Sequence, residues 1–247
     1  MARARRAPGE KTSYREGVPR SILPLFPLGS VLYPGLALPL HIFEERYRLL
    51  VSRLSEGESD VERSFGVVAI RAGHEVGSAS AHTLHEVGTA AVLRRVTPYP
   101  DGRSDILTAG SRRFRLLAVD DSEPYLQAEV EWLDEEAGDP AQVDVRAVRV
   151  AEGFRRYQQL LGGDEEADAD ADAGEGTPLP DDPGVLSYLV SAAMVLDLGD
   201  RQRLLAAPTV ADRLRMLERL LERELTAIAL LGAVPATDLV RSGVSLN

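Results

Sequence analysis

The side chains that most often bind metals or act as nucleophiles are scarce in this chain of 247 residues, which has four His, one Lys and no Cys. Only two of the histidines, His82 and His85, lie close enough in sequence to suggest a shared metal ion. They are three residues apart in a segment that leads into a strand-like run, where such residues point to opposite faces. The lack of Cys also removes thiolate ligands. We therefore expect ordinary surface or strand-edge histidines and no metal site.

Enzymatic motifs are also missing from the sequence. It contains neither a Gly-x-Ser-x-Gly nucleophile motif nor the Gly-rich loop ending in Gly-Lys-Ser/Thr that binds nucleotide phosphates. A Ser–Lys dyad would have to use Lys11, which lies in a polar N-terminal segment. Acidic pairs such as Glu44–Glu45, or Glu129 with Glu131, have the chemistry for acid–base catalysis but more simply form surface ion pairs. We expect no catalytic residues, no cofactor and no enzyme activity.

The elements that would have to position any site change in type along the chain. Up to Trp132, short apolar runs are separated by Pro and Gly, which is typical of strands and turns. We predict strands over 64–70, 89–96, 106–109, 113–119 and 127–133, with tight turns at 99–102 and 110–111. One helix, His41–Leu54, interrupts this half, and within it Glu44 is spaced to pair with Arg48.

Beyond Pro140 the apolar spacing becomes helical. From Val143 to Leu161 apolar residues recur every three or four positions, which predicts an amphipathic helix. Further helices are predicted over 184–196, 200–206 and 210–231. Thr209 is a suitable N-cap for the last of them. A strand-rich half followed by a helix-rich half indicates the α+β class.

Negative charge is concentrated in one segment. Nine acidic residues and no basic ones lie from Asp164 to Asp182, and without them the formal net charge of −11 becomes −2. Such a segment buries too little apolar surface to fold, so we interpret it as a solvated linker; the alternative is a site for a cation or a basic partner. The sequence has no basic cluster of the kind that binds nucleic acid and no apolar run long enough to cross a membrane. We therefore expect neither nucleic acid nor a membrane as a partner.

The most informative segment is residues 23–50, LPLFPLGSVLYPGLALPLHIFEERYRLL. Its prolines and glycines predict a stiff, bent strand ahead of the helix. The segment resembles the signature of the LON substrate-binding domain family. Further matching motifs follow in the family's order, among them FGVV at 65–68, EVGTA at 86–90 and GSRRFR at 110–115. The resemblance extends over about Ser21 to Leu231, with one departure at Glu45, where the family often has Pro.

This resemblance implies a twisted, PUA-like β-barrel subdomain followed by a C-terminal helical bundle. In Lon proteases such a module recognises unfolded or tagged polypeptides ahead of an ATPase and a Ser–Lys peptidase. The corresponding divisions of this chain are a disordered tail at 1–20, a β-rich subdomain at 21–135, a helical subdomain at 141–231 with an acidic disordered linker at 163–182, and a tail at 232–247.

From the resemblance we interpret the chain as a free-standing, non-catalytic module that binds unfolded or tagged polypeptides, a cytoplasmic adaptor in protein quality control that works with a separate protease. Unfolded substrates are best held by aromatic and aliphatic anchors. We therefore expect an exposed apolar patch at Phe26, Tyr33, Phe43 and Tyr47. Two alternatives stay open: a scaffold that binds one folded partner, and a hydrolase that uses the barrel cleft.

Overall fold

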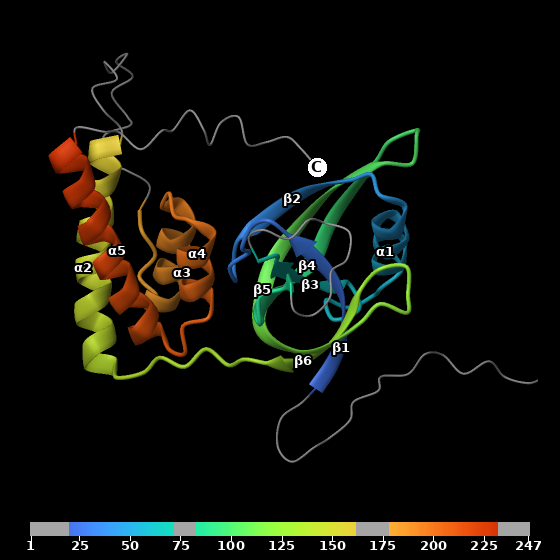
Figure 1. Cartoon of the computed structure of the whole chain (residues 1–247), viewed down its shortest axis with the longest axis horizontal. Helices are drawn as coiled ribbons and strands as arrows, with labels where there is room; N and C mark the ends of the chain where they lie inside the picture. The colour runs from blue at the N-terminus through green and yellow to red at the C-terminus, as the bar shows by residue number, and fades with distance from the viewer. Residues whose placement is uncertain (1–19, 72–82, 162–177, 232–247) are drawn as a thin grey trace, which may run out of the picture. The chain divides into compact units, whose positions relative to one another are not determined.

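The computed structural model describes the chain over residues 20–71, 83–161 and 178–231 (Figure 1). Within these ranges the elements are β1 (Arg20–Leu28), β2 (Ala37–Ile42), α1 (Glu45–Ser55), β3 (Ser64–Ala69), β4 (Val87–Pro98), β5 (Ser104–Asp120), β6 (Gln127–Trp132), α2 (Pro140–Leu161), α3 (Pro183–Ala193), α4 (Leu198–Leu205) and α5 (Val210–Leu231). The predicted tail at 232–247 and most of the predicted linker at 163–182 lie outside the described residues. So does the predicted tail at 1–20, except for its last residue, which begins β1.

The chain divides into two compact units, which are described separately. The sheet unit comprises the residues up to Asp134 together with Leu198–Ala206, and so contains the strands, α1 and α4. The helical unit comprises Glu135–Asp197 and the residues from Ala207 onward, and contains α2, α3 and α5. A mixed sheet with separate helices confirms the predicted α+β class.

The sheet has the strand order β2-β5-β4-β3-β1-β6, and β5 also pairs with β6. One edge of β5 pairs with β4. The other edge pairs with β2 along the first part of β5 and with β6 along the second part. β1 pairs antiparallel with β6 through Arg20–Pro24 and parallel with β3 through Leu25–Leu28. The pairings therefore form a closed circuit, in which each strand pairs with the next: β1, β3, β4, β5, β6 and again β1. β2 pairs with β5 and lies outside this circuit.

β3 and the second half of β1, from Leu25, are covered on both faces, because successive residues enter two different core clusters. Leu25 and Val68 pack in the cluster that contains Phe114, whereas Phe26 and Val67 pack in the other. A strand that is covered on both sides reads as a continuous apolar run instead of an alternating one. This explains the uninterrupted apolar character of β3. Full burial of each such side chain contributes about 1.5–3 kcal/mol.

The predicted helix His41–Leu54 begins too early, because its first residues belong to a strand. β2 occupies Ala37–Ile42, with alternate residues exposed and partly buried. Glu44 then takes the N-cap position of α1 in an extended backbone conformation. From there its carboxylate pairs with Arg46 at 2.7 Å and not with Arg48, since an N-cap residue does not share the helical spacing of the turns that follow.

The predicted turn at Gly110-Ser111 is wrong, because β5 runs straight through it. A Cβ built on Gly110 would lie 2.3 Å from the carbonyl oxygen of Tyr33. Glycine is needed here so that two backbones can approach closely, which is a different use from a turn. The other predicted turn is confirmed: Gly102 has a φ of 84°, and the Arg103 carbonyl accepts a hydrogen bond from the amide that opens the turn, at 2.8 Å.

In the helical unit, α2 and α5 pack along each other and α3 contacts both (Figure 1). The predicted stripe of α2 is buried at Val143, Val150, Phe154 and Tyr157. Thr209 caps α5 as predicted, since its Oγ1 accepts a hydrogen bond from the Asp212 amide at 3.1 Å. Asp182, which the sequence places in the linker, instead caps α3 by accepting from the Val185 amide at 2.8 Å. The predicted linker is therefore wrong at its last residue.

Helix α4 belongs to the sheet unit, which corrects the predicted helical subdomain at 141–231. Three side chain to main chain hydrogen bonds hold it there: Tyr33 to Arg201 at 3.0 Å, Gln202 to Val87 at 2.8 Å and Arg113 to Leu205 at 2.9 Å. The apolar spacing of a helix predicts the helix but not the unit against which it packs. Tyr33 and Arg113, which are distant in sequence, donate to main-chain carbonyls of α4, and Gln202 of α4 donates to a main-chain carbonyl of β4.

Candidate functional site

The outer face of the sheet unit carries a group of exposed side chains at the end of β2, here called the His41 cluster: His41, Phe43, Tyr99 and Asp105. β2 is an edge strand of the sheet. Because successive side chains of a strand point to opposite faces, His41 faces outward while Ile42 enters the core. His41 lies directly opposite Asp105 of β5 in the strand register. Tyr99, at the start of the turn between β4 and β5, and Phe43, just past β2, complete the cluster.

Hydrogen bonds and ring contacts join the four side chains. Asp105 Oδ1 is 2.7 Å from His41 Nδ1, and Asp105 Oδ2 accepts a hydrogen bond from the Tyr99 hydroxyl at 2.5 Å. The centroid of the His41 ring lies 6.2 Å from that of Phe43, with 26° between the planes, and 6.0 Å from that of Tyr99, with 62° between the planes. Both are arrangements in which aromatic rings attract each other.

These hydrogen bonds change the acid–base behaviour of the groups that share them. The bond from Tyr99, followed by that from His41, holds the pKa of the Asp105 carboxyl below its usual range. The same Tyr99–Asp105 bond raises the pKa of the Tyr99 phenol, because the carboxylate disfavours a neighbouring tyrosinate. At neutral pH, Asp105 is thus a carboxylate and Tyr99 a hydrogen-bond donor.

The cluster presents aromatic surface to solvent. Phe43 is 49% exposed and Tyr99 is 40% exposed. Such rings are suited to cover apolar side chains of a polypeptide, because contact removes apolar area of both partners from water. A His–Asp pair is also the orienting half of a catalytic triad. Among the hydrogen bonds of the described residues, His41 is joined to Asp105 and to no hydroxyl.

The predicted exposed patch is wrong at three of its four positions. Phe26, Tyr33 and Tyr47 are 8%, 1% and 6% exposed. Phe26 and Tyr47 stack on each other inside the core, with ring centroids 4.0 Å apart, while the Tyr33 hydroxyl bonds to α4. Phe43 alone among the four has the exposure that was expected.

Sequence reasoning does not find the other members of the His41 cluster. His41 falls at the start of the predicted helix. Tyr99 opens a predicted turn, but the turn motif does not show which other residues lie beside it. The one local signal is the alternation of residues 39–43, which places His41 and Phe43 on the same side of a strand. The contact between His41 and Asp105 joins residues 64 positions apart, so it depends on strand register.

The other residues singled out in the sequence form no comparable site in the described part of the chain. Burial, followed by the charge of Arg71, lowers the pKa of His85. Its predicted neighbour His82 lies outside the described residues. Glu131 forms an ion pair with Arg115 at 3.8 Å. Among the residues that the structure describes, no group of three or more His, Asp or Glu is arranged to hold a metal ion.

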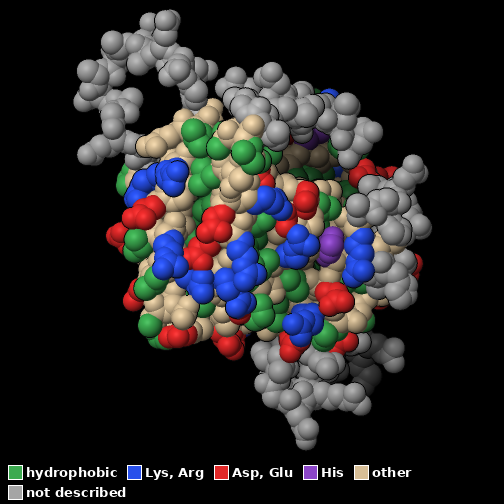
Figure 2. All heavy atoms as spheres, turned by 60° about the vertical axis from the view of Figure 1, so that its left-hand side comes forward, with side chains coloured by type: hydrophobic (Ala, Val, Ile, Leu, Met, Phe, Trp, Pro, Cys, Tyr) green, Lys and Arg blue, Asp and Glu red, His purple; other side chains and the backbone are tan. Residues whose placement is uncertain are grey.

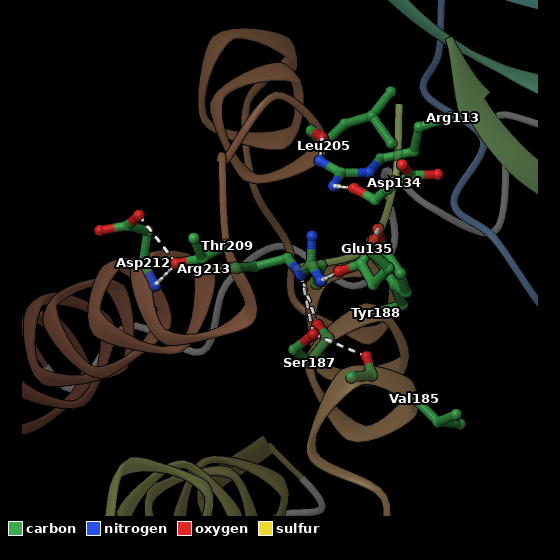
Figure 3. Close-up of polar contacts among 12 residues, drawn as sticks. Arg113, Asp134, Glu135, Val185, Ser187, Tyr188, Leu205, Thr209, Asp212 and Arg213 are labelled. Carbon is green, nitrogen blue, oxygen red and sulfur yellow. Dashed lines mark hydrogen bonds and ion pairs between the residues drawn. The ribbon is translucent and has the colours of Figure 1, made fainter. Parts of the chain in front are cut away.

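The most buried charged side chain of the helical unit is Arg213, which has no exposed surface. It pairs with Glu135, donates from Nε to the Ser187 hydroxyl at 2.8 Å, and lies 3.8 Å from the centre of the Tyr188 ring (Figure 3). The Tyr188 hydroxyl in turn donates to Glu135 at 2.6 Å. These groups engage one another, so the network fastens the start of the helical unit to α3 and α5.

Figure 2 shows a surface on which basic and acidic side chains are interleaved. On the helical unit, Arg146 and Arg149 of α2 share Glu218 of α5, and Arg215 pairs with Asp212. The more exposed Arg215–Asp212 pair contributes only about 0–1 kcal/mol, whereas Arg146 and Glu218 are partly buried. This face therefore shows a mixed, solvated surface. None of the described helices is both long and apolar enough to span a bilayer.

Comparison with known proteins assigns the fold to a family. The model of the ATP-dependent protease La (LON) substrate-binding domain matches residues 22–223. This chain belongs to the LON substrate-binding domain family. The match confirms the resemblance seen in residues 23–50, and it is a match to the substrate-binding part of these proteases.

Relatives of this LON substrate-binding domain include whole proteases and isolated domains. Lon protease 2 of Syntrophobacter fumaroxidans is 28% identical over 226 residues, which are 90% of this chain and 27% of that protein. Lon protease of Escherichia coli K12 is 26% identical over 204 residues, 82% of this chain and 25% of that protein. The chain thus spans about a quarter of the length of these relatives.

Two solved structures share the fold. A Lon N-terminal domain protein from Xanthomonas campestris superposes with a TM-score of 0.56 at 26% identity, covering 82% of this chain and 98% of that one. The N-terminal domain of a Mycobacterium avium complex Lon protease has a TM-score of 0.58 at 16% identity, with the same coverage of both chains. At that identity the second comparison concerns the fold alone.

Proposed function

We propose that this LON substrate-binding domain holds unfolded segments of other polypeptides at the His41 cluster and acts as an adaptor that passes them to a protease. The observation that carries the proposal is the exposure of Phe43, a large aromatic side chain that is 49% exposed and whose ring, like that of the exposed Tyr99, contacts the ring of His41. Contiguous exposed apolar surface on a soluble protein usually marks an interaction site. An unfolded chain offers the apolar side chains that such a surface covers.

Family membership supports this proposal, since the family is described by its binding of substrate and the matched relatives are proteases. We further infer that the circuit of pairings through β5 is the twisted, PUA-like barrel that the sequence resemblance implies. A closed set of strands would hold β2 and the turn at Tyr99 in one geometry. A site on such rigid elements binds without first paying an ordering cost.

The test is fluorescence anisotropy with a labelled, permanently unfolded polypeptide, measured with and without a folded competitor. We expect a dissociation constant in the micromolar range that the folded protein does not change. Phe43→Ser should weaken binding about tenfold, because aromatic anchors at the centre of an interface dominate its energy. Leu117→Ser is the matched control, since Leu117 is an apolar residue of the same unit, 40% exposed, outside the cluster.

Each outcome separates the site from the function. Equal binding by the wild type and Phe43→Ser would reject the His41 cluster while leaving polypeptide binding in place. If the wild type does not bind at tens of micromolar, the function itself is rejected. A scaffold for one folded partner is then the better hypothesis, and a pull-down from cell extract is the next experiment.

A further inference from the structure

Within the described residues, an arginine repeatedly lies over an aromatic ring and also pairs with a carboxylate. The triplets are Arg46–Tyr47–Glu44, Arg53–Tyr125–Glu123, Arg112–Trp132–Asp134 and Arg213–Tyr188–Glu135, with the guanidinium carbon 4.6, 5.4, 5.5 and 3.8 Å from the ring centre, respectively. The arrangement is favourable because the guanidinium plane stacks on the negative face of the ring while its N–H groups reach the carboxylate.

The His41 cluster contains the ring and the carboxylate of such a triplet. Its Tyr99 hydroxyl donates to Asp105 at 2.5 Å. In the helical unit the Tyr188 hydroxyl donates to Glu135 in the same way, at 2.6 Å, and there Arg213 covers the ring and pairs with the carboxylate. Within the described residues, an arginine therefore covers the ring and pairs with the carboxylate in the Tyr188–Glu135 pair, whereas His41 is the second partner of the carboxylate in the Tyr99–Asp105 pair.

Among the described residues, Asp105 forms no ion pair or hydrogen bond with an arginine. Arg103, two residues away, forms its ion pair with Asp101 at 2.7 Å, and its charge acts on Asp105 only as a smaller contribution to the lowered pKa. The partners of Asp105 are instead the Tyr99 hydroxyl and the His41 ring. The bond from Tyr99 and that from His41 hold its pKa below the usual range, so the carboxylate stays ionised. Its side chain is 49% exposed, which leaves a negative charge beside exposed aromatic rings.

We propose that the His41 cluster binds an arginine side chain of the polypeptide, stacked on the exposed rings and paired with Asp105. The inference rests on the proposed function and narrows it: the substrates are unfolded segments in which an arginine adjoins an apolar residue that Phe43 covers. Arginine is preferred to lysine, because a planar guanidinium stacks on a ring and donates two hydrogen bonds to a carboxylate at once.

The first experiment uses a small probe, so that it does not depend on polypeptide binding. N-acetyl-argininamide is titrated into the protein while the NMR signals of the His41, Phe43 and Tyr99 rings are followed. The control is the citrulline analogue, which has nearly the same shape but no charge. We expect saturable shifts of these ring signals with the arginine compound alone.

The second experiment compares two labelled unfolded peptides that differ only by arginine or citrulline next to an apolar residue. We expect the arginine peptide to bind about three- to tenfold more tightly, the sum of a cation–π contact and an exposed ion pair. Asp105→Asn should bring this ratio close to one. Asp60→Asn, which removes the same charge from another exposed carboxylate of the sheet unit, should preserve it. Higher salt should lower the ratio.

Phe43→Leu is a second variant that keeps an apolar side chain but removes the ring. It should lower the preference for arginine about threefold, through loss of the π face, and change binding of the citrulline peptide less than about twofold. Together with Asp105→Asn, it separates stacking from ion pairing.

The outcomes distinguish this inference from the function on which it rests. Equal affinity for the two peptides, with Phe43→Ser still weakening both, would overturn the arginine preference and leave polypeptide binding in place. If the preference for arginine persists in Asp105→Asn, the arginine-binding site does not lie at the His41 cluster. If no peptide binds but argininamide still shifts the ring signals, the arginine site is supported and the proposed function is rejected. If neither probe binds, both are rejected.

Discussion

Two groups of aromatic side chains in the sheet unit have opposite surroundings. In the buried group, Phe26, Tyr47 and Phe65 are 8%, 6% and 1% exposed, and the ring of Phe26 contacts both of the others. In the His41 cluster, Phe43 and Tyr99 are 49% and 40% exposed, both rings contact His41, and Tyr99 donates to the Asp105 carboxylate. The first group is buried in the core, although Arg46 lies over the Tyr47 ring at 4.6 Å, whereas the second is open to solvent beside His41 and Asp105.

Phe43 and Tyr47 show most directly what separates the groups. They are four residues apart and would share a face if one helix ran from His41 onward. The change from β2 to α1 between them turns Phe43 to solvent and Tyr47 into the core. An aromatic residue type therefore does not identify a binding residue. Exposure to solvent separates Phe43 from Tyr47.

The largest effect that this comparison predicts is at Phe65. Phe65→Ala should lower the free energy of unfolding by about 3–5 kcal/mol, because a buried ring is lost and a cavity remains. Urea denaturation followed by fluorescence of Trp132, which belongs to the same unit, measures the change. Phe65→Leu, expected to cost about 1 kcal/mol, covers the case in which the alanine variant does not fold. If Phe65→Ala lowers the free energy of unfolding by less than about 1 kcal/mol, the proposed difference between the buried and the exposed group is contradicted.

Overpacking should produce the next largest effect, beside the buried ring of Phe114. A Cβ on Gly88 would lie 2.5 Å from that ring and 2.5 Å from the carbonyl oxygen of Val67. Gly88→Ala should therefore cost about 1–3 kcal/mol of stability. Gly29→Ala is the control, because nothing lies within 4 Å of its Cβ, and it should change stability by less than about 0.5 kcal/mol. Equal effects in the same denaturation experiment would contradict the tight packing.

A much smaller effect on stability is expected at Phe43. Phe43→Ala should change the free energy of unfolding by less than about 1 kcal/mol, because an exposed ring has little packing to lose. Tyr47→Ala, its buried counterpart, should cost several times more. Thermal or urea unfolding of both variants decides the matter. A loss at Phe43 as large as that at Tyr47 would make Phe43 a residue of the core.

The smallest predicted effect is a shift of the pKa of Tyr99 in the His41 cluster. NMR of 13Cζ-labelled tyrosine should show Tyr99 ionising above the usual tyrosine pKa of about 10, because of its hydrogen bond to Asp105. Asp105→Asn should return the pKa toward that value, and Tyr99→Phe identifies the signal. A Tyr99 pKa that is unshifted in the wild type would contradict the hydrogen bond.

The same bond sets the pH window in which it stabilises the sheet unit. The pKa of Tyr99 is raised on folding, so its contribution is present below the usual tyrosine pKa and is lost as pH rises through the raised value. The pKa of Asp105 is lowered, so its contribution is present above the usual aspartate pKa and is lost as pH falls through the lowered value. Between these limits both contributions are fully present, so the pair should cause no change of stability with pH.

Much of the fold could be predicted because its signals are local. Strands β3, β4 and β6 and helices α2, α3 and α5 lie within a few residues of the predicted ranges, and the Asp-Gly turn and the Thr209 cap are confirmed. Three of the errors have one cause. The last two residues of β2 fall inside the predicted helix, β5 continues through the predicted turn at Gly110, and α4 belongs to the sheet unit and not to the predicted helical subdomain. In each case the deciding contact comes from a residue far away in the sequence.

The sequence by itself determined the family, through the residues of 23–50. Residue types and spacing suffice for this, because they set local conformation. Tertiary structure alone decided which aromatic side chains face solvent and which carboxylate lies beside them. His41 meets Asp105 because β2 pairs with β5 in one register. A shift of that register by one residue would turn His41 toward the core, although the sequence of either strand would be the same.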